Sequence, residues 1–216
     1  LSELTFTTTT PVEVLFTDVD FTITIGEPDD GYIKFYETSA TLPKYTAGEK
    51  GNVRMFRTIV ANQWNTIVLP FTLSKANAEA AFGSDVQLAE FSGFETEYAD
   101  EEDVTPDGIT IKFSTYTMSA RKSMTGGKPF LIKTSKDIES FEATECTLFD
   151  AVTDVKKLDE WETPGVFTGS LVKTKVPADG LFIYDNKFYY STGATNIKAF
   201  RAWLELGAVL DKETDF

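Results

Sequence analysis

Hydrophobic and polar residues alternate over many short segments of this chain, and this alternation is the pattern of β-strands. In the segment 20–25 the apolar side chains fall on every second position, so they share one face of an extended strand. Similar segments recur along most of the 216 residues, separated by turn-forming residues. The spacing predicts an all-β protein, an antiparallel β-sandwich of the jelly-roll-like kind.

The clearest local pattern lies in the second quarter of the chain. Residues 64–69 are almost continuously apolar or β-branched, which predicts a strand buried on both faces. Pro70 should end that strand, because proline has no N–H group to donate to a central ladder. Ser74 is a favourable N-cap and Gly83 a favourable exit residue, so we predict one short helix over Lys75–Phe82.

Two short connections predict which strands pair. Residues 61–63 allow only a tight connection, so strand 53–60 should pair antiparallel with strand 64–69. The run 181–190 predicts a hairpin, because Asp185-Asn186 at its centre tolerates the left-handed backbone that a two-residue turn needs.

The remaining segments set the expected domain limits. Residues 152–162 fit either a short helix or a loop, and residues 197–206 alternate well enough for a terminal strand. Residues 39–52 mix prolines, glycines and charges, which is typical of a domain boundary or a long surface loop. We therefore predict a strand-rich segment over residues 1–50 that packs with the rest, a main β-sandwich domain over 51–210, and a tail over 211–216.

The apolar faces of these segments define the expected core. The single cysteine, Cys146, cannot form an intrachain disulfide and lies in a strand-like run, so we interpret it as a buried structural thiol. The side chains expected to be largely buried are Trp64, Ile67, Leu69, Phe82, Phe130, Ile132, Phe200 and Leu204.

The charge balance limits the partners. The chain has 34 acidic and 20 basic residues, a net charge of −14. Such a surface repels phosphate backbones and anionic lipid, so we expect no nucleic acid partner. No run of about 20 apolar residues is present, so we expect no membrane span in this segment. Other surface proteins or glycans are the expected partners.

Histidine is absent from the sequence, and this removes the commonest catalytic chemistry. Without an imidazole there is no Ser-His-Asp or Cys-His arrangement and no usual zinc site. A glycosidase would need two carboxylates, but no acid lies in a characteristic motif. We therefore expect no catalytic residues and no enzyme activity.

Calcium is the one cofactor worth considering, and otherwise we expect none. Its oxygen ligands would have to come from acidic loops, although none of these matches an EF-hand. The candidates are Asp18, Asp20, Asp29, Asp30 and the run from Asp100 to Asp103.

Several motifs occur together in one order between residues 53 and 206. They are Gln63-Trp64-Asn65-Thr66-Ile67-Val68-Leu69-Pro70-Phe71, Ala81-Phe82-Gly83, Gln87-Leu88-Ala89-Glu90-Phe91, Gly127-Lys128-Pro129-Phe130-Leu131-Ile132-Lys133, Phe188-Tyr189-Tyr190 and Ala199-Phe200-Arg201-Ala202-Trp203. This order resembles a β-rich domain common near the C-termini of secreted and cell-surface proteins of gut and oral Bacteroidales. The resemblance implies an exported, extracellular or cell-surface module, and it supplies no catalytic residues.

These observations predict a non-catalytic surface module with a structural or adhesion role. The alternative is a carbohydrate-binding module, because flat aromatic faces suit sugar rings, and a glycoside hydrolase is a distant third. The residues expected to bind such a ligand are Trp161, Tyr184, Tyr189 and Tyr190, with core packing as the competing explanation.

Overall fold

The computed structural model describes residues 30–98, 108–159 and 162–206 of the chain. Two units are distinguished, Leu1–Tyr32 and Ile33–Phe216, and the second holds nearly all of the described residues. Strands dominate these residues and only one helix occurs among them, which confirms the all-β prediction. The elements in chain order are β1 (Tyr32–Tyr36), β2 (Lys50–Ile59), β3 (Asn65–Val68), α1 (Lys75–Phe82), β4 (Gln87–Glu97), β5 (Gly108–Thr115), β6 (Pro129–Lys133), β7 (Ile138–Thr147), β8 (Val155–Leu158), β9 (Pro164–Ser170), β10 (Thr174–Lys175), β11 (Ala178–Tyr184), β12 (Lys187–Thr192), β13 (Asn196–Ile197) and β14 (Arg201–Glu205).

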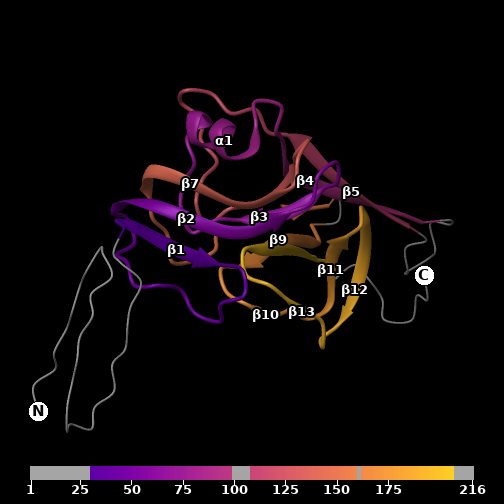
Figure 1. Cartoon of the computed structure of the whole chain (residues 1–216). Coiled ribbons are helices and arrows are strands. Elements are labelled where there is room, and N and C mark those ends of the chain that lie inside the picture. The colour runs from indigo at the N-terminus through magenta and orange to yellow at the C-terminus, as the bar shows by residue number, and fades with distance from the viewer. Residues whose placement is uncertain (1–29, 99–107, 160–161, 207–216) are drawn as a thin grey trace, which may run out of the picture. The chain divides into compact units, whose positions relative to one another are not determined.

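In the described part of the chain the strands form three larger sheets and one two-stranded pair (Figure 1). The first sheet has the order β1-β2-β7, the second β3-β6-β4-β5 and the third β12-β11-β14-β9-β8, while β10 pairs with β13. All pairs with a defined register are antiparallel. Within the described residues, β12 is therefore an edge strand whose only partner is β11.

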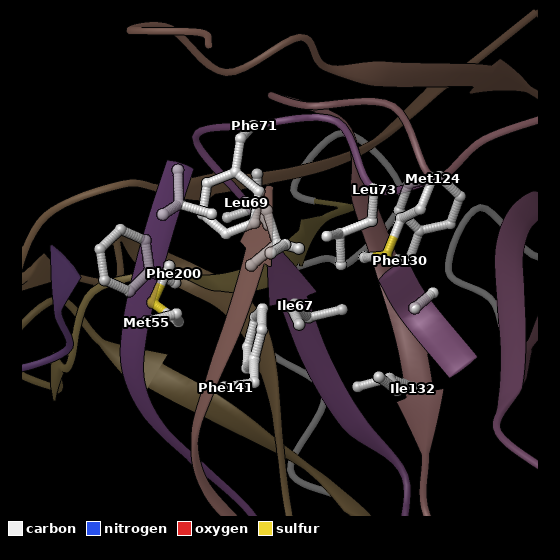
Figure 2. Close-up of a cluster of buried hydrophobic side chains, with 14 of the residues drawn as sticks. Met55, Ile67, Leu69, Phe71, Leu73, Met124, Phe130, Ile132, Phe141 and Phe200 are labelled. Atoms are coloured by element: carbon white, nitrogen blue, oxygen red, sulfur yellow. The ribbon is translucent and has the colours of Figure 1, made fainter. Parts of the chain in front are cut away.

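The larger buried cluster lies among the first two sheets and the helix. Ile67 of β3, Phe130 of β6 and Phe141 of β7 belong to it, and Figure 2 shows them directed into one interior. Phe82 of α1 meets Phe141 edge to face, with ring centroids 4.9 Å apart. The helix is thus fixed to the sheets by its last apolar residue.

A second buried cluster lies between the second and third sheets. Phe91 of β4 and Leu131 of β6 pack with Phe167 of β9 and Leu204 of β14. The rings of Phe91 and Phe167 approach to 6.2 Å between centroids, so side chains of the two sheets share one apolar layer. The jelly-roll-like sandwich order itself stays a prediction.

Local patterns predicted the helix and the hairpin correctly. Ser74 caps α1 by accepting a hydrogen bond from the backbone N–H of Asn77, and Gly83 ends the helix with a φ of 97°. The β11–β12 hairpin turns at Asp185 and Asn186, whose φ values of 49° and 56° are left-handed as expected.

The predicted pairing of strand 53–60 with strand 64–69 is wrong. β2 pairs with β7 and β3 pairs with β6, so the two strands belong to different sheets. The connection is closed by Asn65, which accepts a hydrogen bond from the N–H of Val60 and donates one to its carbonyl. A side chain therefore supplies the bonds that a hairpin ladder would have made, and the chain leaves the first sheet.

Two other segments differ from their predictions. Residues 152–162 are neither helix nor loop throughout, because they contain strand β8, which pairs with β9. The predicted terminal strand over 197–206 is interrupted between β13 and β14, where Phe200 has a left-handed φ of 63°. The predicted segments before residue 30, the tail 211–216 and most of the acidic loop at 95–107 lie outside the described residues, and the domain limits stay predictions.

The predicted core is confirmed at seven of its eight positions. Ile67, Leu69, Phe82, Phe130, Ile132, Phe200 and Leu204 are each at most 2% exposed. Trp64 is the exception, because it is only partly buried and packs at the margin of the second cluster. Burial was expected from the apolar run that follows it, but Trp64 precedes β3 and lies where the sheets end.

Cys146 is buried in β7, as its strand-like surroundings predicted. Burial raises the pKa of this thiol to about 11, although a hydrogen bond from Asn77 opposes the increase. The thiol is therefore protonated at neutral pH, which fits a structural side chain.

Among the described residues, one cation is almost completely buried. The guanidinium of Arg57 in β2 is 1% exposed and donates to three carbonyl oxygens. The acceptors are Phe200 at 3.1 Å, Thr58 at 2.9 Å and Thr66 in β3. Burial and the nearby charge of Arg201 lower the pKa of Arg57, while Glu37 opposes them. The unperturbed pKa of a guanidinium is so high that Arg57 stays charged at neutral pH.

Glu37 is the acidic residue whose charge acts on Arg57. Its carboxylate is 8% exposed and accepts hydrogen bonds from Lys198 at 2.6 Å and from Arg201 at 2.9 Å. Burial alone would raise the pKa of Glu37, but these two cations outweigh it and lower the pKa. The carboxylate is thus ionised in the folded protein.

We predict that Arg57→Met lowers the free energy of unfolding by roughly 3–5 kcal/mol, because the carbonyls of Phe200, Thr58 and Thr66 each lose a hydrogen bond, two of them in the buried interior. Urea unfolding monitored by circular dichroism measures this. Arg54→Met is the matched control in the same strand. The Arg54 partner Glu142 is 48% exposed, so a loss of only about 0–1 kcal/mol is expected there. Equal losses in the two variants would contradict the assignment.

We predict a pH-dependent loss of stability for Glu37→Gln. The folded pKa of Glu37 lies below its ordinary 4.5, so the carboxylate stabilises the fold above that pH and the contribution fades as the pH falls through the folded value. At pH 7 the variant should be less stable by roughly 1–3 kcal/mol, and the gap should close in acid. Unfolding curves between pH 7 and pH 3 test this; a gap independent of pH would show that charge has no part.

Candidate functional site

A pocket of about 710 Å³ opens beside the second sheet. Its lining comes from α1, from β4, β5 and β6, and from the β11–β12 hairpin. This volume falls within the range of roughly 300–1,000 Å³ that is usual for small-molecule sites. The lining segments lie far apart in the sequence, so the pocket exists only in the folded protein.

The floor of the pocket is apolar and firmly held. Leu88 of β4 and Leu131 of β6 are buried in the sheet, while Ile111 and Phe113 of β5 are partly exposed to the opening. Phe113 packs edge to face on Phe167 with centroids 5.5 Å apart. Leu88 belongs to the larger core cluster, and Leu131, Ile111 and Phe113 belong to or pack against the second, so the floor is continuous with both clusters.

The aromatic residues of one wall come from two separate elements. Trp64 precedes β3, and Phe188 with Ile183 belongs to the β11–β12 hairpin. The Trp64 backbone N–H donates to the Asn186 Oδ1 atom at 2.7 Å, which joins the hairpin tip to β3. Trp64 thus contributes to a pocket wall, in place of the core position that the sequence predicted.

Tyr116 forms another part of the lining and is fixed by its surroundings. Its hydroxyl donates to the carbonyl of Ser123 at 2.5 Å, and its ring meets Phe130 with centroids 4.9 Å apart. The ammonium of Lys122 lies 3.8 Å from the ring centroid. Burial, and then the charge of Glu90, raises the pKa of Tyr116, so it remains a neutral phenol.

Three charged residues line the pocket, and their balance is positive. Lys75 and Glu79 face each other on α1 at 3.6 Å, one turn apart. Lys187 follows the hairpin turn and takes part in no ion pair among the described residues. The lining therefore carries one cation more than it carries anions, although the whole chain has a net charge of −14.

The aromatic residues predicted to bind a ligand do not meet at this pocket. Tyr184 and Tyr189 lie together, with ring centroids 6.3 Å apart, and Tyr189 also stacks on Phe182. Tyr190 follows Tyr189 in β12 and so projects to the opposite face of the strand. Trp161 lies outside the described residues. The ligand-binding role of these residues stays a prediction.

Sequence reasoning missed the residues that do line the pocket. Phe113 and Phe188 occupy ordinary alternating strand positions, and alternation does not tell whether a half-buried face meets another sheet or a cavity. Lys187 follows the turn that the sequence predicts, but no sequence pattern near it indicates that it lines the same pocket as residues of α1.

Within residues 30–98, 108–159 and 162–206, no group of three or more acidic, cysteine or histidine residues could hold a metal ion. Asp30 is described, but the other calcium candidates, Asp18, Asp20, Asp29 and Asp100 to Asp103, lie outside the described residues. The one helix of the described part is too short to cross a membrane.

Comparison with known proteins gives one local similarity. The chain is 37% identical over 90 residues to the NH(3)-dependent NAD(+) synthetase of Lactobacillus johnsonii. The matched part is 41% of this chain, and the chain spans 29% of the length of that relative. No family model matches, and no solved structure matches.

This similarity contradicts the predicted function. The relative is an enzyme, so the predicted function is wrong. The wrong prediction is the non-catalytic exported module with a structural or adhesion role, together with its carbohydrate-binding and glycoside hydrolase alternatives. That prediction was based on the absence of histidine and on the order of the motifs. Neither observation indicates what a pocket can bind. The expected absence of catalytic residues, the extracellular location and the Bacteroidales resemblance stay predictions.

Proposed function

We propose that the pocket binds a nucleotide-class ligand, a flat heterocyclic ring joined to an anionic group, and that the chain serves an enzyme that uses such a ligand. The observation that carries the proposal is the lining, which places aromatic side chains and lysines around one apolar floor. The name of the similar protein supports it, because NAD⁺ is a dinucleotide.

The ring would lie against the aromatic part of the lining. Trp64 and Phe188 line the wall and Phe113 lines the floor, and none of the three is fully buried. Stacking of a base on an aromatic side chain contributes about 1–3 kcal/mol, measured by alanine substitution. The apolar floor beneath would exclude water from the second face of the ring.

The anionic group would lie near the lysines. Lys187 is the better candidate, because Lys75 already faces Glu79 at 3.6 Å. In water at physiological salt, charges more than about 8 Å away are largely screened, so the excess of acidic residues elsewhere does little to oppose an anion here. Binding should therefore weaken as the ionic strength rises.

We predict saturable binding of NAD⁺ that is weakened in both Trp64→Ala and Lys187→Gln. From the usual contribution of stacking, Trp64→Ala should raise the Kd roughly 5-fold to 150-fold. Isothermal titration with NAD⁺, AMP and nicotinamide separates the two parts of the ligand. Thermal unfolding of each variant shows whether the fold survives.

The matched control is Lys156→Gln, which removes an exposed lysine from β8 at the other edge of the third sheet. It should bind NAD⁺ like the wild type. No binding of any of the three ligands by the folded wild type, or equal affinity in wild type and Trp64→Ala, would overturn the proposal.

A further inference from the structure

A single side-chain hydrogen bond holds the hairpin against the rest of the pocket. Asn186 Oδ1 accepts the backbone N–H of Trp64 at 2.7 Å. For the hairpin tip, residues 184–187, this is the one hydrogen bond to another element in the part of the chain that the structure describes. Both residues line the pocket, so the bond closes its wall.

The turn itself does not need this side chain. Asn186 has a φ of 56°, and glycine adopts that conformation at least as readily as asparagine. Glycine is the residue most favoured at the second position of such turns. The asparagine amide therefore has a use beyond the turn, and its contact with Trp64 is the use that the structure shows.

The hairpin tip depends on this contact, because among the described residues no other hydrogen bond joins residues 184–187 to another element. β12 pairs only with β11 among the described residues, and residues 184–190 are all exposed. Ile183 packs at the margin of the second cluster, which anchors β11 but not the tip. Without the bond, the wall that carries Phe188 and Lys187 could move away from Trp64.

We propose that Asn186 is a positioning residue: its carboxamide oxygen fixes the hairpin wall at Trp64 and so sets the width of the pocket for its ligand. The inference rests on the proposed function for the nature of the ligand, and on the structure alone for the contact. Asn186 would act through the wall and need not touch the ligand.

The test compares three variants. Asn186→Gly keeps the left-handed turn and removes the acceptor, Asn186→Asp keeps an acceptor oxygen, and Asp185→Gly is the control at the neighbouring turn position, where φ is 49°. Hydrogen exchange at the Trp64 amide, followed by NMR, reports the contact without any ligand. Titration with NAD⁺ reports the pocket.

Asn186→Gly should accelerate exchange of the Trp64 amide and raise the Kd for NAD⁺ roughly threefold to tenfold, the range expected for one hydrogen bond. Asn186→Asp should restore slow exchange, and Asp185→Gly should leave exchange and affinity unchanged. Unchanged Trp64 exchange in Asn186→Gly would overturn the positioning role. Unchanged affinity with faster exchange would overturn its effect on the ligand. A wild type that binds no NAD⁺ would overturn the proposed function alone, because the exchange results stand independently.

Discussion

The buried guanidinium of Arg57 is the constraint on which the arrangement of the sheets depends. Its N–H groups reach carbonyls in β2, in β3 and at Phe200, just before β14, so one side chain joins strands of all three larger sheets. A planar donor fork can satisfy three acceptors in fixed directions, and no apolar residue or lysine can do the same. Phe200 adopts its left-handed backbone at this junction.

Other hydrogen bonds follow from the same junction. The Phe200 carbonyl also accepts the N–H of Val68 at 3.2 Å, and the Ala202 N–H donates to the Thr66 hydroxyl at 3.0 Å. β3 is thereby held beside β14, and the residue that precedes β3 is Trp64. A polar contact in the interior thus determines where a pocket wall begins.

The sequence allowed part of this to be predicted. Capping residues around α1 and the Asp185-Asn186 turn act within a few residues, so local rules identified both. The pairing of β2 could not be predicted, because the Asn65 amide makes the hydrogen bonds that a hairpin between β2 and β3 would have made. β3 therefore belongs to the second sheet and β2 to the first. Arg57 was visible in principle, since it shares a strand face with the buried Val53, Met55 and Ile59. The pocket was not, because its walls come from segments more than 100 residues apart.

The central claim is that the pocket beside β4 and β5 binds a nucleotide-class ligand. NMR of the isotope-labelled chain during addition of NAD⁺ tests it most directly, because it locates the contact residue by residue. We expect saturable shift changes at the Trp64 indole, at Phe188 and at Leu88. Changes confined to β8, at Val155 and Lys156, or no saturable change at all, would contradict it.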